Sequence, residues 1–588
     1  MNTRKKAVAA VGLVGVMALT AACGGSSKPT TGGTTGAAKS SFNGSVTQVL
    51  NPSDKKGGTL NLWANQDADS LDPAIGYYAW VWDMQRLYAR TLVAYPSAPG
   101  AAGLKLQPDL ATAMPTVSAD GLTYTFTLKK GIKFDDGTPV TSKDIKYGIE
   151  RIFAPELAGG PSAYLTGVLD QGQKYPGPYK DTDPNKLGLK SVTTPDDSTI
   201  TFKLAAPSSD FLYFLSMGTA SPIEKSKDTG VNYAKMPGST GPYKISQYVP
   251  NKIIAFVRNP NWDQSTDTIR KALPDAINVN ITSNADDVDS RLLAGTGDLD
   301  PGQVGVQTTA QTKILTNPAL KANTDDAPNG FIRYISMQTQ VAPFNNVHCR
   351  KAVEYAANST DLQTARGGSY AGQIATNMLP PNILGHDNYD PYNLAAGKSQ
   401  LDKAKSELAL CGQPNGFSTT IAVRNNKPKE KKEAEALQAA LAPLKINLTL
   451  DLYDGANYNA VIGSPANVHK KGYGLIVFGW GADYPTAPGF LGVLVDGRII
   501  PASGNNNYPE LNDPAINALI DDAKKQTDPN AVAADYTKIN HMVMDQAVYL
   551  PVVYDQALNY RNPRLTNVVF EQAFGMLDFQ ALGVSDGK

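Results

Sequence analysis

Alternation of apolar and polar residues is the sequence feature that most restricts the fold of this chain. Residues 122–128 read LTYTFTL, which places four apolar side chains on one face of a β-strand. The same period of two recurs at residues 200–204, 277–281 and 444–452. Each run predicts a half-buried strand, and their spread along the chain predicts sheets in several regions.

Amphipathic helical segments separate these strands. Thr141 followed by Asp144 resembles a capping box, with Asp in place of Glu, and the apolar residues after it fall on one helical face. Further helices are predicted at residues 283–294 and 429–441. Strands and helices intermixed over more than 500 residues predict a multidomain α/β protein.

Composition and motifs restrict the function. The chain has 588 residues with 54 Lys+Arg and 54 Asp+Glu, so we expect no nucleic-acid partner. Its four histidines lie far apart in the sequence, so we expect no metal and no other cofactor. The sequence has neither the His-Glu-x-x-His nor the Gly-x-Ser-x-Gly motif, and its Ser-x-x-Lys match at residues 53–56 lies in a predicted tether. We therefore expect no enzyme, and an envelope hydrolase remains a distant alternative.

The first residues predict export. Basic residues 4–6 precede the small and apolar run 7–22, which is too short to span a bilayer and is typical of a signal peptide at residues 1–22. The small residues before Cys23 resemble the lipobox of bacterial lipoproteins, which implies cleavage before Cys23 and attachment of lipid to its thiol. A secreted chain without lipid is the alternative. Residues 23–54, which contain much Gly, Ser and Thr, are predicted to form a flexible tether.

Two cysteines follow the tether. Cys349 and Cys411 are the only thiols after Cys23. Because an exported protein meets an oxidising environment, we expect these two to form a disulfide. Two buried free thiols are the alternative.

The region around the first alternating run matches a known family. It reads SADG at residues 118–121 and GIKFDDGTPVT at residues 131–141, and it resembles the signature of bacterial extracellular solute-binding proteins of the oligopeptide/dipeptide-binding family (family 5). Further matches follow in family order from about residue 55 to residue 580: GGTL at 57–60, SLDP at 70–73, TGPY at 240–243, NPNW at 259–262 and GWGADYP at 479–485.

This resemblance implies an α/β, two-lobed, periplasmic-binding-protein-like fold (type II, cluster C) with an extra domain in the first lobe. The expected segments are domain I at 55–95, 190–329 and 554–588, domain II at 96–189, and domain III at 330–553. The two crossings near residues 329 and 553 would then act as a hinge.

The resemblance also implies a function. We expect a monomer, anchored by lipid on the outer face of the cell membrane, which captures oligopeptides and delivers them to an ABC permease with a cytoplasmic ATPase. The alternatives are the same fold with another cargo, such as a nickel chelate, haem or an oligosaccharide, and a receptor for peptide signals.

Five residues are the candidate ligand contacts. By resemblance, Asp483 pairs with the α-amino group of the peptide; the alternative is that it caps a local turn. Trp480 would form an indole wall or pack in the core, and Tyr484 is a weaker candidate. The loop with Asp67 and Ala68 faces the cleft by resemblance. One or two of the aromatic residues at positions 77, 78, 80 and 82 are expected to line the cleft.

Overall fold

The computed structural model describes residues 40–587 except 158–160, 426 and 503. The predicted signal peptide, Cys23 and the first part of the predicted tether lie outside the described residues. Within the described part, the helices are either too short or too polar to cross a membrane.

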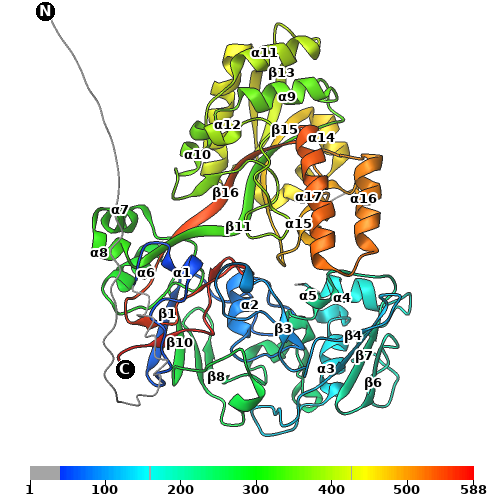
Figure 1. Ribbon diagram of the computed structural model, residues 1–588, viewed down its shortest axis with the longest axis vertical. Helices are drawn as coiled ribbons and strands as arrows, with labels where there is room; N and C mark the ends of the chain where they lie inside the picture. Colours follow the sequence, from blue (N-terminus) through cyan, green and yellow to red (C-terminus); the bar gives the residue numbers. More distant parts are fainter. Residues whose placement is uncertain (1–39, 158–160, 426, 503, 588) are drawn as a thin grey trace, which may run out of the picture. The chain divides into compact units, whose positions relative to one another are not determined.

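Two four-stranded sheets form the first lobe (Figure 1). The first has the order β1-β10-β9-β8, with β1 parallel to β10 and the other pairs antiparallel. The second is antiparallel, in the order β4-β5-β7-β6. Their bounds are β1 Thr59–Ala64, β8 Tyr243–Val249, β9 Ile253–Arg258, β10 Ala276–Ile281, β4 Thr116–Val117, β5 Thr123–Thr127, β6 Val192–Asp196 and β7 Thr199–Lys203.

A six-stranded mixed sheet forms the second lobe, in the order β12-β16-β11-β15-β13-β14. Its inner strands β11, β13, β15 and β16 supply the largest buried apolar cluster, onto which the surrounding helices pack. The strand bounds are β11 Thr324–Met337, β12 Gly372–Ile374, β13 Ser418–Arg424, β14 Asn447–Tyr453, β15 Tyr473–Gly481 and β16 Tyr549–Tyr560.

Several helices matter for the site and for the tests below. In the first lobe these are α2 (Ala79–Gln85), α3 (Ser142–Arg151), α4 (Ser162–Leu169), α5 (Phe211–Phe214) and α6 (Ala285–Leu293). In the second lobe they are α9 (Val347–Ala356), α12 (Pro428–Leu441), α15 (Ala487–Val495), α16 (Pro514–Lys524) and α17 (Pro529–Asp545).

The predicted strands and helices are present. β5 lies within the first alternating run, and β7, β10 and β14 each overlap one of the other three. The predicted strand at 444–452 is wrong in its first residues, because Leu444 lies in a short 3₁₀ turn and β14 begins at Asn447. The capping box at Thr141 and Asp144 is confirmed. The helix predicted at 283–294 is capped by Asn284, one residue later than expected.

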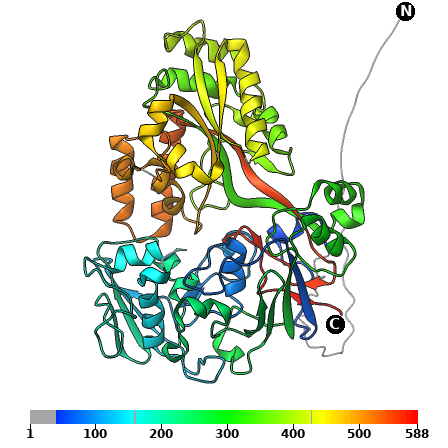
Figure 2. The ribbon, with the colours of Figure 1, turned by 180° about the vertical axis from the view of Figure 1, so that it is seen from behind.

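The two longest strands join the lobes. β11 and β16 pair side by side and run from the second lobe into the first (Figures 1 and 2). Their ladder is interrupted between Pro328 and Ile332, and Gly330 lies there with φ +87°, a conformation that glycine adopts at little cost. This interruption falls in the segment for which a hinge is predicted.

The prediction of a flexible tether at residues 23–54 is wrong for residues 40–54. This segment forms the short helix α1 (Gly44–Thr47), and Leu50 is fully buried and exchanges backbone hydrogen bonds with Val568. Three of its apolar residues, at positions 42, 46 and 50, recur every four residues and pack against the first lobe. The tether prediction rested on polar composition and did not take this spacing into account.

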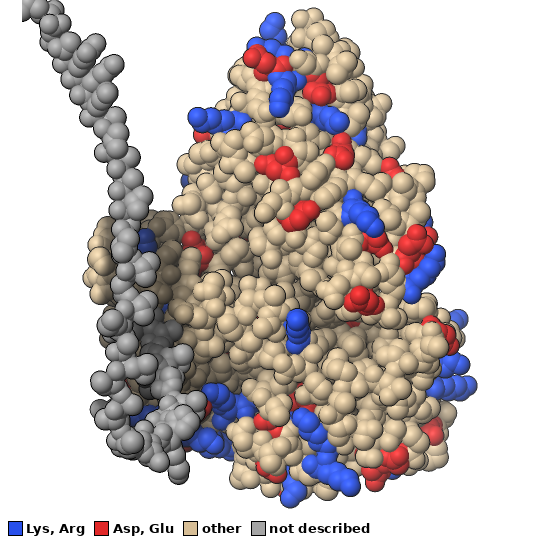
Figure 3. Space-filling model, in the orientation of Figure 1, with Lys and Arg blue, Asp and Glu red and all other residues tan. Residues whose placement is uncertain are grey.

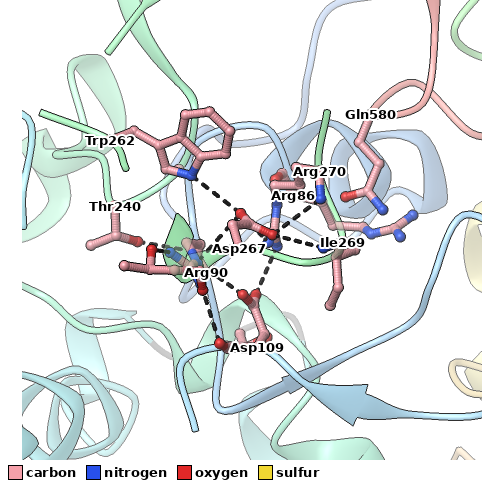
Figure 4. Close-up of polar contacts among 12 residues, drawn as sticks. Arg86, Arg90, Asp109, Thr240, Trp262, Asp267, Ile269, Arg270 and Gln580 are labelled. Carbon is pink, nitrogen blue, oxygen red and sulfur yellow. Dashed lines mark hydrogen bonds and ion pairs between the residues drawn. The ribbon is translucent and has the colours of Figure 1, made fainter. Parts of the chain in front are cut away.

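A buried ion network lies in the first lobe (Figure 4). Arg90 Nε lies 2.8 Å from Asp109 Oδ1, and Arg270 Nη2 lies 2.9 Å from Asp109 Oδ2. Arg270 also pairs with Asp267 at 3.1 Å. The two guanidinium groups hold the pKa of Asp267 below its ordinary value, although burial opposes them. The network links Asp109, which follows the short strand β3 (Gln107–Pro108), to segments close to the first sheet.

Charged side chains of both signs are interspersed on the face in Figure 3. Cys349 on α9 and Cys411 are joined as a disulfide, with their Cα atoms 5.2 Å apart.

Candidate functional site

The loop after β15 projects from the second lobe toward the first. β15 lies between β11 and β13, and it ends at Gly481. Helix α15 begins at Ala487, with Thr486 as its N-cap, whose hydroxyl accepts a hydrogen bond from Gly489 N at 3.2 Å. The loop between them carries Asp483 and Tyr484. A buried strand and a capped helix therefore fix both ends of this loop.

Two tyrosines of the first lobe donate hydrogen bonds to Asp483. The Tyr77 hydroxyl lies 2.7 Å from Asp483 Oδ2, and the Tyr164 hydroxyl donates to the same oxygen. Tyr77 precedes α2, whereas Tyr164 belongs to α4. Burial, together with the Asp483 carboxylate, raises the pKa of both hydroxyls, so they remain donors at neutral pH.

The second carboxylate oxygen of Asp483 is available. Within the described part of the chain, no hydrogen bond reaches Oδ1 and no lysine, arginine or histidine pairs with this carboxylate. Asp483 is half-buried. Removing a carboxylate from water costs free energy when no cation is paired with it. A positively charged group of the ligand can offset this cost by binding the carboxylate.

A cavity of about 570 Å³ opens beside Asp483. Its walls include Tyr77 and Tyr164, the loop at residues 205–210, and side chains of α15, α16 and α17. Two smaller cavities also border Asp483, and Trp82 lines both of them. The main cavity has the size of a ligand pocket and receives walls from both lobes.

The predicted contacts fall into two groups. Trp480 and Tyr484 line the same cavity as Asp483. Trp480 is half-buried, and its indole Nε1 has no hydrogen-bond partner among the residues that the structure describes. Asp67 and Ala68 do not border this cavity. The Asp67 carboxylate instead accepts hydrogen bonds from the Tyr248 hydroxyl at 3.2 Å and from Asn251 N at 2.7 Å.

Of the four aromatic residues at and before α2, two line cavities and two do not. Tyr77 is 45% exposed and lines the main cavity, and Trp82 lines the smaller ones. Trp80 lies in the apolar core, and Tyr78 is exposed at the start of α2.

Residues 105–500 match the family model for bacterial extracellular solute-binding proteins, family 5. The chain belongs to this family. As a member of family 5 it is a solute-binding protein whose two-lobed α/β fold agrees with the arrangement of sheets described above.

Named relatives of this family 5 protein bind different solutes. It is 28% identical to "Heme-binding protein A" of Haemophilus influenzae, over 80% of this chain and 83% of the relative. It is 24% identical to the "Probable D,D-dipeptide-binding periplasmic protein DdpA" of Escherichia coli, over 87% of this chain and 92% of the relative. Among solved structures, "Clavulanic acid biosynthesis oligopeptide binding protein 2" has 43% identity and a TM-score of 0.87, covering 93% of this chain and 99% of that one.

Two residues of this solute-binding protein's site were missed by sequence reasoning. Tyr164 and Asp210 both lie in the first lobe and contact the loop of Asp483. Tyr164 is 319 positions from Asp483 in the sequence. Because 27 tyrosines occur in the chain, no local pattern distinguishes this one.

Proposed function

We propose that this family 5 protein captures oligopeptides between its two lobes and binds their α-amino group at Asp483. The main support for this proposal is the set of contacts that this carboxylate makes. Its Oδ2 accepts hydrogen bonds from two tyrosine hydroxyls, whereas Oδ1 has no partner among the described residues. A cavity of about 570 Å³ lies beside it. A protonated amine at Oδ1 completes a charge-assisted hydrogen bond.

The peptide main chain and side chains then occupy the cavity. Trp480 and Tyr77 provide ring surface for the peptide, and α15–α17 provide the opposite wall. Water can fill the space that a short side chain leaves, so the site accepts many sequences. The names of the oligopeptide-binding and dipeptide-binding relatives support this cargo.

Calorimetric titration tests the amine contact. For Asp483→Ala we expect peptide affinity to fall by about 2–5 kcal/mol, because the ligand amine is left buried without its partner. N-acetylation of the peptide should cause a similar loss in the wild-type protein and little further loss in Asp483→Ala. Unchanged affinity after both changes would show that the proposal is wrong.

An aspartate outside the cavity is the matched control. The Asp67→Asn variant keeps the shape of a side chain that already has partners in its own lobe. If the loop with Asp67 and Ala68 also binds the peptide, as predicted from the sequence, affinity falls in this variant as well. If only Asp483 binds the amine, the response to acetylation remains that of the wild-type protein.

The cellular role that we propose is supported by the family and by the first residues of the sequence. The chain would be a monomer held at the outer face of the cell membrane by lipid on Cys23, and it would deliver peptide to an ABC permease driven by a cytoplasmic ATPase. It would perform no covalent chemistry. Its domains would be those predicted from the sequence, with the hinge near residues 329 and 553.

Haem is the second candidate cargo, because one relative is named for binding it. The same titration with haem in place of peptide separates the two candidates. Binding of haem that is unchanged by Asp483→Ala, without binding of peptide, would favour haem.

A further inference from the structure

The loop that carries Asp483 also inserts into the opposite lobe. Tyr484 is 7% exposed and belongs to the apolar cluster of the second sheet of the first lobe. Its ring stacks on Tyr213 with centroids 6.0 Å apart, and it meets Phe214 and Tyr164 edge-on, each at 5.4 Å. The lobes therefore touch through a side chain adjacent to the ligand-binding carboxylate.

Asp210 is the polar partner of this insertion. It precedes α5 and is buried. Its Oδ2 accepts a hydrogen bond from the Tyr484 hydroxyl at 3.2 Å, and its Oδ1 accepts one from the Thr486 hydroxyl at 3.2 Å. Each lobe thus supplies a carboxylate that accepts hydrogen bonds from the other lobe. Asp483 accepts hydrogen bonds from hydroxyl groups of the first lobe, and Asp210 accepts them from hydroxyl groups of the second.

Burial makes the charged form of the Asp210 carboxylate less favourable. Burial raises the pKa of Asp210 to about 6, although the hydroxyls of Tyr484, Thr486 and Ser209 lower it in part. In the described part of the chain, no lysine, arginine or histidine pairs with it. The titratable groups that face it are Tyr484 of the loop, Tyr213 of α5, Tyr164 of α4 and Tyr536 of α17. The same cavity is also bordered by the carboxylates of Asp483 and Asp496, the ammonium group of Lys524 and the hydroxyl of Tyr77.

We propose that Asp210 is a positioning residue that holds the Asp483 loop against the first lobe and thereby sets how readily the lobes close. With Tyr484 and Thr486 bound to Asp210, Asp483 faces Tyr77 and Tyr164. When the lobes separate, these contacts break together and water reaches Asp210. The effect on peptide affinity rests on the function proposed above, but the effect on closure does not.

This coupling has a defined pH dependence. We take the arrangement described here, in which the lobes touch through Tyr484, as the closed form; there the pKa of Asp210 is about 6, and for the open form we take its ordinary value of 3.8. The closed form therefore binds a proton more tightly than the open form. The equilibrium shifts toward the closed form as the pH falls through 6 toward 4. Between pH 8 and pH 5 the closed-to-open ratio should rise about tenfold.

Pulsed dipolar spectroscopy on the mature chain without peptide measures this ratio. Spin labels at Lys190→Cys and Lys432→Cys, both exposed positions on different lobes, report the closed and open populations. The wild-type ratio should show the tenfold rise. Asp210→Asn keeps an oxygen acceptor without the charge, so its closed population at pH 8 should exceed that of the wild type and should not change with pH. The Asp210→Ala variant should have a smaller closed population than the wild type at every pH.

The matched control is Asp289→Asn. Burial also raises the pKa of Asp289 to about 6, but this residue accepts a hydrogen bond from Gln307 N within the first lobe. This variant should keep the wild-type pH response. If Asp210→Ala does not fold, Tyr484→Phe keeps the ring and removes one donor, and it should also reduce closure.

Two results would overturn the proposal. One is an Asp210→Asn variant that keeps the wild-type pH response. The other is an Asp210→Ala or Tyr484→Phe variant that closes as the wild type does. Because no peptide is present in this experiment, a failure here is distinct from a failure of the amine contact at Asp483.

Discussion

Among the described residues, hydroxyl groups and not a cation orient Asp483. Tyr77 and Tyr164 both donate to Oδ2, so the rotation of the carboxylate is restricted by neutral groups. A lysine in their place would neutralise the site and compete with the ligand amine. Tyrosines fix the direction of Oδ1 without that competition.

Removing one of these hydroxyls tests this arrangement. We expect Tyr164→Phe to weaken binding of a peptide with a free amino group by about 1–2 kcal/mol, because a hydrogen bond to the charged carboxylate is lost. The control is Tyr389→Phe, which removes a hydroxyl that donates to Asp545 on the second lobe, outside the cavity. Equal affinities of the two variants in calorimetric titration would contradict the assigned role.

The sequence indicated the loop of this site but not its partners. Asp483 and Trp480 lie within a short family motif, so local reading could find them. The Tyr248 hydroxyl, which contacts Asp67, is 181 positions away, and Asp210 is 274 positions from Tyr484. The first contact depends on how segments of one lobe pack and the second on how the two lobes meet, and local periodicity encodes neither.

At the scale of elements, helix α3 depends on its capping box. Asp144 Oδ2 accepts hydrogen bonds from the Thr141 amide at 2.7 Å and from the Thr141 hydroxyl at 2.8 Å. We expect Thr141→Ala to destabilise α3 by about 1 kcal/mol. Hydrogen exchange of the α3 amides measures this loss, and Thr141→Ser, which keeps the hydroxyl, should retain most of the protection. Similar exchange in both variants would show that the threonine side chain does not stabilise the helix.

Elements with a clear period were predictable, and irregular ones were not. The runs that became β5, β7 and β10 alternate over five or more residues. The segment 40–54 has few apolar residues among polar ones, yet it is fixed because Leu50 fills a site beside Val568. Tertiary packing decided its structure against its composition.

At the scale of the molecule, the buried ion network of the first lobe carries a prediction. Replacing Asp109 by Asn leaves Arg90 and Arg270 buried with less compensating charge, so we expect a loss of about 3–5 kcal/mol in the stability of that lobe. Asp275→Asn breaks the exposed pair with Arg258 and should cost less than about 1 kcal/mol. Scanning calorimetry compares the two variants, and equal unfolding temperatures would contradict this account.

The overall architecture was readable because its family motifs lie in order along the chain. Motifs from residue 57 to residue 485 fall in both lobes, so they predicted two lobes with an extra domain. How the lobes contact each other was not readable, since it depends on single side chains such as Tyr484.

A crystal structure of the mature protein with a bound peptide tests the central claim most directly. We predict that the peptide lies between the lobes with its α-amino nitrogen about 2.7–3.2 Å from Asp483 Oδ1. A peptide bound elsewhere, or one whose amino group points away from Asp483, would contradict it.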